Sequence, residues 1–66
     1  MLTNQIGETA GHIWHTLEEE GPLRIAALKN QLEVPELIVH MALGWLARED
    51  KIVFESDGRA YRVRLK

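Results

Sequence analysis

Apolar side chains in the first third of the chain recur every three or four residues, which is the spacing of one face of an α-helix. Charged and polar side chains fall on the opposite face. This segment is therefore predicted to be an amphipathic helix that covers a core. Gly21 and Pro22 end the helix, because glycine suits the position just past a helix end and proline cannot continue one. The apolar face consists of Ile6, Ala10, Ile13, Trp14 and Leu17.

Two further helices are predicted in the middle of the chain. Apolar residues three and four positions apart mark a short second helix over residues 25–32. A tight break at Glu33 and Val34 separates it from a third helix over residues 35–49. Pro35 fits the first turn of this third helix, because the N–H that proline lacks would have no partner there.

The apolar pattern changes its period after Asp50, from about 3.6 residues to about 2, which predicts two β-strands. Asp57 and Gly58 predict the turn between them, because Asp-Gly supplies the positive φ angles of a two-residue type I′ turn. Earlier in the chain, Leu23 and Arg24 are long enough only for a stub of a third strand. The predicted fold class is α+β, with three helices, a C-terminal two-stranded hairpin and this short strand near Leu23.

The predicted turn fixes which residues of the hairpin face each other. One face of the hairpin is then apolar and packs on the helices, whereas the other is mostly charged and meets water. The apolar face consists of Ile52, Phe54, Tyr61, Val63 and Leu65. The predicted pairs are Ser56 with Arg59, Glu55 with Ala60, Phe54 with Tyr61, Val53 with Arg62, Ile52 with Val63 and Lys51 with Arg64.

The length of 66 residues predicts a single domain over residues 1–66 with a small core. There is no cysteine, so neither a disulfide nor a thiolate metal site can support this core. We therefore expect self-association, with a homodimer as the simplest form. No apolar run reaches the roughly 18 residues of a membrane span, and the first four residues lack the features of a signal peptide. These features predict a cytoplasmic protein with no membrane partner.

Charge is distributed unevenly along the chain, whose net charge is −2. Residues 1–50 carry three basic and eight acidic side chains, whereas residues 51–66 carry five basic and two acidic ones. The predicted hairpin is therefore the only cationic element. This balance is far from that of a strongly basic nucleic-acid-binding protein.

The order helix, strand stub, helix, tight turn, helix and hairpin resembles the winged helix-turn-helix superfamily. The likeness lies in Ile25-x-x-Leu28-x-x-x-Leu32-x-Val34, then Val39-x-x-x-Leu43-x-x-Leu46, then Arg48-Glu49-Asp50-Lys51-Ile52. The chain departs from the family pattern at Glu33 and Asp50, where glycine is usual. More narrowly, it is similar to small stand-alone bacterial winged-helix proteins of unknown function. The resemblance implies a DNA-binding or transcription-regulator-like fold and names no ligand.

The third helix would enter the DNA groove in such a fold, and its exposed residues are unsuited to that role. Base recognition needs hydrogen-bond donors and acceptors, and phosphate binding needs cations. His40 could donate a hydrogen bond when protonated, and Glu36 could accept one from cytosine. Leu37 and Met41 offer only apolar contact. Sequence-specific recognition by this helix is therefore disfavoured, and the alternative is that protein covers this face.

The apolar arc of the third helix is wider than one core requires, at roughly 240° against the usual ~100°. Leu37, Met41 and Trp45 are therefore candidate interface residues. Gly7 and Gly11 on the first helix would let another backbone approach closely. These residues predict self-association through or near the third helix. The alternative is a monomer in which Trp45 simply fills the core.

The basic side chains of the predicted wing are candidate phosphate ligands, which could straddle a minor groove. The alternative is a solvated edge, because charged side chains also keep a hairpin soluble and prevent edge pairing. The sequence leaves both interpretations open. The candidates are Lys51, Arg59, Arg62, Arg64 and Lys66, with His40 added from the third helix.

No site for metal or catalysis is predicted. Glu8, His12, His15 and Glu19 share one stripe of the first helix, which is more typical of an exposed, salt-bridged face than of a metal site. The chain has no phosphate-binding glycine loop and no plausible nucleophile, so we expect neither an enzyme nor a cofactor. The favoured hypothesis is a weak or non-specific duplex DNA-binding module. The alternative is a module for dimerisation or a protein partner that has lost nucleic-acid binding.

Overall fold

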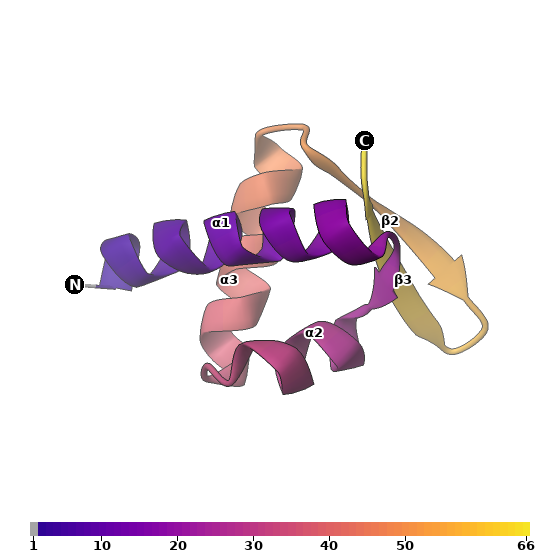
Figure 1. Cartoon of the computed structure of the whole chain (residues 1–66), viewed down its shortest axis with the longest axis horizontal. Helices are drawn as coiled ribbons and strands as arrows, with labels where there is room; N and C mark the ends of the chain where they lie inside the picture. The colour runs from indigo at the N-terminus through magenta and orange to yellow at the C-terminus, as the bar shows by residue number, and fades with distance from the viewer. Residues whose placement is uncertain (1) are drawn as a thin grey trace.

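The computed structural model describes residues 2–66, which form three helices and a three-stranded antiparallel sheet (Figure 1). This is the α+β winged-helix arrangement that the sequence predicts. None of the three helices combines the length and hydropathy that a bilayer span requires within residues 2–66. In chain order the elements are α1 (Leu2–Glu20), β1 (Leu23–Arg24), α2 (Ile25–Leu32), α3 (Glu36–Arg48), β2 (Ile52–Asp57) and β3 (Ala60–Leu65).

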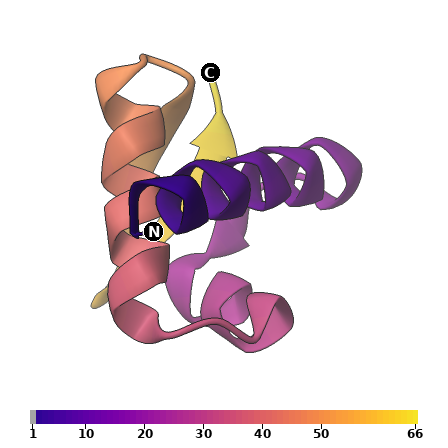
Figure 2. The same cartoon turned by 90° about the vertical axis from the view of Figure 1, so that its left-hand side faces the viewer.

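The helices surround a small apolar core. α1 crosses α3 (Figure 2), and in the view of Figure 1 its N-terminal end extends past that helix. On α1 the predicted apolar face is confirmed, with Ile13 and Leu17 buried and Trp14 half-buried. The largest fully buried side chains join all three helices to the sheet, which is why so short a chain can close one core. They are Ile13, Leu28, Val39 and Val63.

Two backbone bends hold the helix-turn-helix and the wing in place. Glu33 ends α2 with a φ of 51°, and Asp50 leads from α3 to β2 with a φ of 62°. Both angles lie in the left-handed region, where a side chain costs roughly 1 kcal/mol or more. The bends are therefore those of the family pattern, and they form although neither position has the usual glycine.

The sheet has the strand order β1–β3–β2, so the predicted stub is present and pairs with β3 rather than with β2. Leu23 lies opposite Val63, and Arg24 lies opposite Arg62. Leu23 thus extends the apolar side of the sheet over the core, while Arg24 is brought to the charged side.

The predicted register of the hairpin is wrong by two residues. Gly58 and Arg59 form the loop, and Asp57 lies opposite Ala60. Of residues 57–60, only Gly58 has a positive φ, at 67°, which fits a type II′ turn instead of type I′. A shift of two keeps every side chain on its predicted face, because the period of a strand is two. The other pairs are Ile52 with Leu65, Val53 with Arg64, Phe54 with Val63, Glu55 with Arg62 and Ser56 with Tyr61.

The apolar face of the wing is covered at its base and open toward its tip. Ile52 and Val63 are buried, and Leu65 is half-buried. Phe54 and Tyr61 share this face, yet they are 41% and 57% exposed. The tip extends past the helices, so the expected packing on them holds only for the base of the wing (Figure 1).

Candidate nucleic-acid interface

The outer face of the sheet gathers arginines from two strands. Arg24 of β1, Arg62 of β3 and Glu55 of β2 stand in one row across the sheet. Arg64 follows two positions after Arg62 and points to the same side. Arg24 was not among the predicted phosphate ligands, because only the basic side chains of residues 51–66 were assigned to the wing. The predicted short strand at Leu23 and Arg24 was the signal that could have revealed Arg24, if its pairing with β3 had been known.

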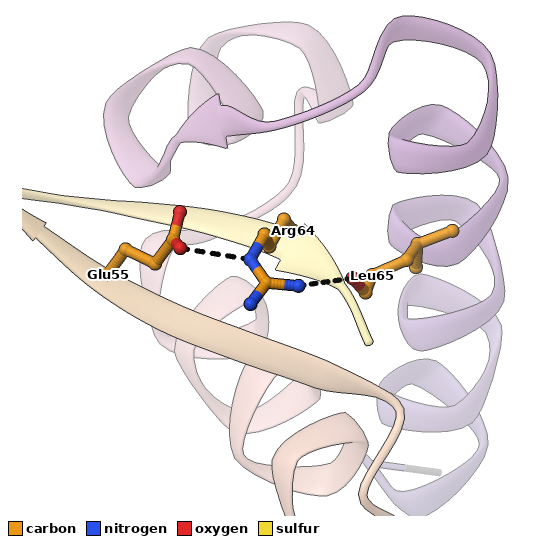
Figure 3. Close-up of polar contacts among 3 residues, drawn as sticks. All are labelled: Glu55, Arg64 and Leu65. Atoms are coloured by element: carbon orange, nitrogen blue, oxygen red, sulfur yellow. Dashed lines mark hydrogen bonds and ion pairs between the residues drawn. The ribbon is translucent and has the colours of Figure 1, made fainter.

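Both acidic side chains of the wing, Asp57 and Glu55, form ion pairs with arginines. The Arg24 guanidinium reaches across β3 and donates to Asp57, with Nη2–Oδ2 and Nε–Oδ2 distances of 3.0 and 3.1 Å. Arg64 donates from Nε to Oε2 of Glu55 at 3.0 Å and from Nη1 to the Leu65 carbonyl oxygen at 3.2 Å (Figure 3). The acids therefore orient two arginines on the outer face, and their charge is already compensated.

Two wing arginines have no acidic partner among residues 2–66. Arg62 is exposed between Arg24 and Arg64, and Arg59 is exposed in the loop. Neither donates a hydrogen bond to, or forms an ion pair with, any side chain of the described residues. Across the sheet Arg62 has Arg24 on one side and Glu55, which is bonded to Arg64, on the other, so the arginines of the outer face outnumber its acids and leave a positive charge there.

The two predicted lysines lie at the base of the wing, away from this centre. Lys51 approaches Glu49 with an Nζ–Oε1 distance of 3.6 Å, and Lys66 pairs with Asp50. All four side chains are largely exposed, so these pairs contribute little and leave the lysines accessible to another anion. The five predicted cations therefore fall into three groups. Lys51 and Lys66 at the base form ion pairs. In the middle of the wing Arg64 is paired and Arg62 is not, and Arg59 at the tip has no acidic partner within residues 2–66.

The N-terminal end of α3 carries an ionised carboxylate. Glu36 accepts from Lys29 of α2 at 3.0 Å, and His40 lies 4.0 Å from the same oxygen. The hydrogen bond from Lys29 and its positive charge hold the pKa of Glu36 below its usual value. A carboxylate here repels phosphate, so the helix that would enter a groove is poorly suited to an anionic partner.

The predicted apolar residues of α3 remain accessible. Leu37 is 61% exposed, Trp45 is 42% exposed and Met41 is half-buried, so Trp45 does not simply fill the core. Ile38, by contrast, is buried. A stripe of apolar surface therefore runs along the side of α3 that faces away from its own subunit.

A groove of about 300 Å³ lies between α1 and the C-terminal half of α3. Gly7 and Gly11 face open space, since an added Cβ at either position would meet no atom within 4 Å. Trp45 borders both this groove and the apolar stripe of α3, so the two features are continuous. The residues around the groove include Gly7, Gly11, Trp14, Trp45, Glu49 and Lys51.

The polar stripe of α1 does not assemble a metal site. Within residues 2–66, no group of three or more histidine, cysteine or carboxylate side chains is arranged to hold a metal ion. His15 instead lies 3.9 Å from Glu18, a carboxylate on the next turn.

A family model described as "Winged helix-turn-helix domain (DUF2582)" matches residues 1–65. The chain belongs to this winged helix-turn-helix family. The uncharacterized protein MJ1608 of Methanocaldococcus jannaschii is 44% identical over 67 residues, covering 98% of this chain and 96% of that protein. The solution NMR structure of protein BT2368 from Bacteroides thetaiotaomicron is similar with a TM-score of 0.84 and 31% identity, covering 98% of this chain and 79% of that chain.

Membership in the winged helix-turn-helix family confirms the resemblance that the sequence suggested, and the similar NMR structure confirms the fold class. Winged-helix architecture supports a regulator-like or DNA-binding module as the general function. The finer assignment depends on the side chains that this chain presents.

Proposed function

We propose that the chain is a cytoplasmic, non-enzymatic single-domain module that binds the backbone of duplex DNA through the outer face of its wing. One observation carries this proposal: Arg62 is exposed and forms no ion pair within residues 2–66, because Glu55, its neighbour across the sheet, is bonded to Arg64. Arginine presents a planar fork of donors that matches phosphate oxygens. A phosphate at Arg62 would supply the negative charge that this part of the sheet lacks.

The remaining predicted cations would extend this contact along the wing. Arg59 stands at the tip, and Lys51 and Lys66 stand at the base. His40 on α3 would add a hydrogen-bond donor through an imidazole N–H. Binding of this kind follows the backbone and carries little sequence information.

A duplex of mixed sequence tests the proposal directly. The labelled duplex is titrated with the protein at low salt, and its fluorescence anisotropy is recorded. We expect binding that weakens steeply when the salt is raised, because phosphate contacts release counterions. Absence of detectable binding at low salt would remove this function.

The exposed apolar surface supports a second candidate, which is self-association as a homodimer. Leu37, Met41 and Trp45 form a stripe beside a groove where Gly7 and Gly11 permit close approach. Glycine within a helix costs up to ~1 kcal/mol relative to alanine, and no described residue packs against either glycine closely enough to require it. A second subunit in the groove would account for both features, and another protein could dock there in the same way.

Sedimentation tests the second candidate. We expect the native chain to sediment as a dimer, and the variant with Leu37→Glu and Met41→Glu to sediment as a folded monomer, because charges oppose burial at an interface. Tyr61→Glu is the matched control, since Tyr61 is 57% exposed but lies on the wing. A native chain that is monomeric at high concentration would contradict self-association through this surface.

A further inference from the structure

The tip of the wing presents two aromatic rings on the face opposite to Arg62. Phe54 lies opposite Val63, and Tyr61 lies opposite Ser56, so the two aromatic residues are diagonal neighbours on one face. They are 41% and 57% exposed. They continue the apolar stripe of the wing beyond the point where the helices cover it.

These rings lie outside the hydrophobic core of residues 2–66. Neither Phe54 nor Tyr61 belongs to the core or to the half-buried residues packed against it. Neither ring is stacked on another aromatic ring of the described residues. An exposed pair of large rings on a short hairpin promotes aggregation unless a partner covers them. Packing in the core of residues 2–66 therefore does not account for two large aromatic residues at these positions.

The charge around the rings indicates an anionic partner. Arg59 lies in the loop that follows directly after β2 and has no acidic partner among residues 2–66. The nearby acids, Glu55 and Asp57, are already neutralised by Arg64 and Arg24. Aromatic rings beside an unpaired arginine are the elements with which proteins hold single strands, by stacking on bases and attracting phosphates.

We propose that the inner face of the wing tip binds an unpaired DNA strand, with bases stacked on Tyr61 and Phe54 and a phosphate held by Arg59. This inference rests on the proposed function, because it assigns the second face of the same wing to the same kind of polymer. The outer face then holds the backbone of the duplex, and the tip holds bases where the strands separate. Stacking tolerates any base, so this contact needs no sequence preference.

A labelled oligothymidine of about 15 nucleotides is the probe, because it forms no duplex and offers both bases and phosphates. Its affinity is measured by fluorescence anisotropy for the native chain, Tyr61→Leu, Phe54→Leu and Tyr61→Phe. The matched control is Leu2→Ala, which removes a large apolar side chain of similar exposure, 48%, from α1 instead of the wing. Each variant is also titrated with a duplex of mixed sequence.

Removal of either ring is expected to weaken oligothymidine binding by about 5- to 100-fold, since stacking on one ring contributes that much. Tyr61→Phe keeps the ring and is expected to retain affinity within about twofold, as is Leu2→Ala. Duplex binding by Tyr61→Leu should stay unchanged, because the outer face is intact. Circular dichroism checks that each variant is folded, and Phe54→Leu keeps the test valid if Tyr61→Leu unfolds.

Several results would overturn the inference. Oligothymidine binding that is absent in the native chain, or unchanged in both leucine variants, would show that the rings do not stack on bases. Tyr61→Leu that alters sedimentation but not oligothymidine affinity would assign the rings to a protein contact. Failure of the proposed function is a separate result, in which the native chain binds no duplex at low salt.

Discussion

Arg24 on β1 and Arg62 on β3 lie directly opposite each other in the sheet. Like charges in this position destabilise a pair of strands, by up to about 1 kcal/mol. The Arg24 guanidinium reaches past Arg62 to Asp57 of β2, and Arg62 gains no such partner. Glu55, which lies opposite Arg62 on its other side, is bonded to Arg64, so Arg62 forms no ion pair within residues 2–66, which is the basis for assigning it to an external anion.

Replacement of Arg62 should therefore separate stability from binding. We expect Arg62→Thr to change the free energy of unfolding by less than about 1 kcal/mol, because it removes repulsion by Arg24 together with attraction by Glu55 and places a good strand former in β3. The same variant should bind duplex DNA more weakly. Urea unfolding and anisotropy titration measure the two effects. A large loss of stability would instead assign Arg62 a structural role.

The left-handed residues offer a test of the backbone. Glu33→Gly should raise the free energy of unfolding by up to about 1 kcal/mol, since glycine adopts a φ of 51° without the Cβ clash. Glu49→Gly is the matched control, because Glu49 has an ordinary φ of −81° and glycine there should destabilise. Chemical denaturation measures both variants, and equal effects would contradict the left-handed bend at Glu33.

Glycines in the turn and in α1 should respond in opposite directions. Gly58→Ala should destabilise by about 1 to 2 kcal/mol, because Gly58 has a φ of 67° in the loop of the hairpin. Gly7→Ala should stabilise the subunit by up to about 1 kcal/mol, since α1 gains helix propensity and the added Cβ meets open space. Thermal unfolding measures both. Destabilisation by Gly7→Ala would indicate a contact that the subunit fold lacks.

The ion pair between α2 and α3 predicts a pH dependence. Lys29 lowers the pKa of Glu36 in the folded protein, so the pair stabilises the fold at neutral pH and this contribution is lost as the pH falls through the lowered pKa. A double-mutant cycle with Lys29→Met and Glu36→Gln measures the coupling. We expect a favourable coupling at neutral pH that disappears in acid, and a coupling independent of pH would contradict the assignment.

Most of the fold could be predicted because periodicity reports burial directly. The three helices follow from apolar spacing and from breaks at Gly21, Glu33 and Pro35, and the faces of the strands follow from alternation. The register could not be predicted reliably, because Asp57-Gly58 fits both a type I′ turn and a type II′ turn. The two turns give strand registers that differ by two residues and keep the same side chains on each face. Packing on the helices selects between them, and packing is not visible in local sequence.

The candidate site was only partly accessible from sequence for a related reason. The exposure of Leu37 and Trp45 on α3 agrees with the excess width of its apolar arc. The position of Arg24 beside Arg62 depends on pairing between strands that are far apart in the chain. The exposure of Phe54 and Tyr61 depends on how far the wing extends past the helices, which no pattern within the hairpin encodes.

The salt dependence of duplex affinity tests the central claim, that the outer face of the wing binds phosphate, most directly. Log Kobs is measured against log salt concentration for the native chain, Arg62→Ala and Arg48→Ala, an exposed arginine of α3 that serves as control. The account predicts a steep negative slope that flattens by about one unit in Arg62→Ala and is unchanged in Arg48→Ala. Equal flattening by both variants, or no effect of Arg62→Ala, would contradict it.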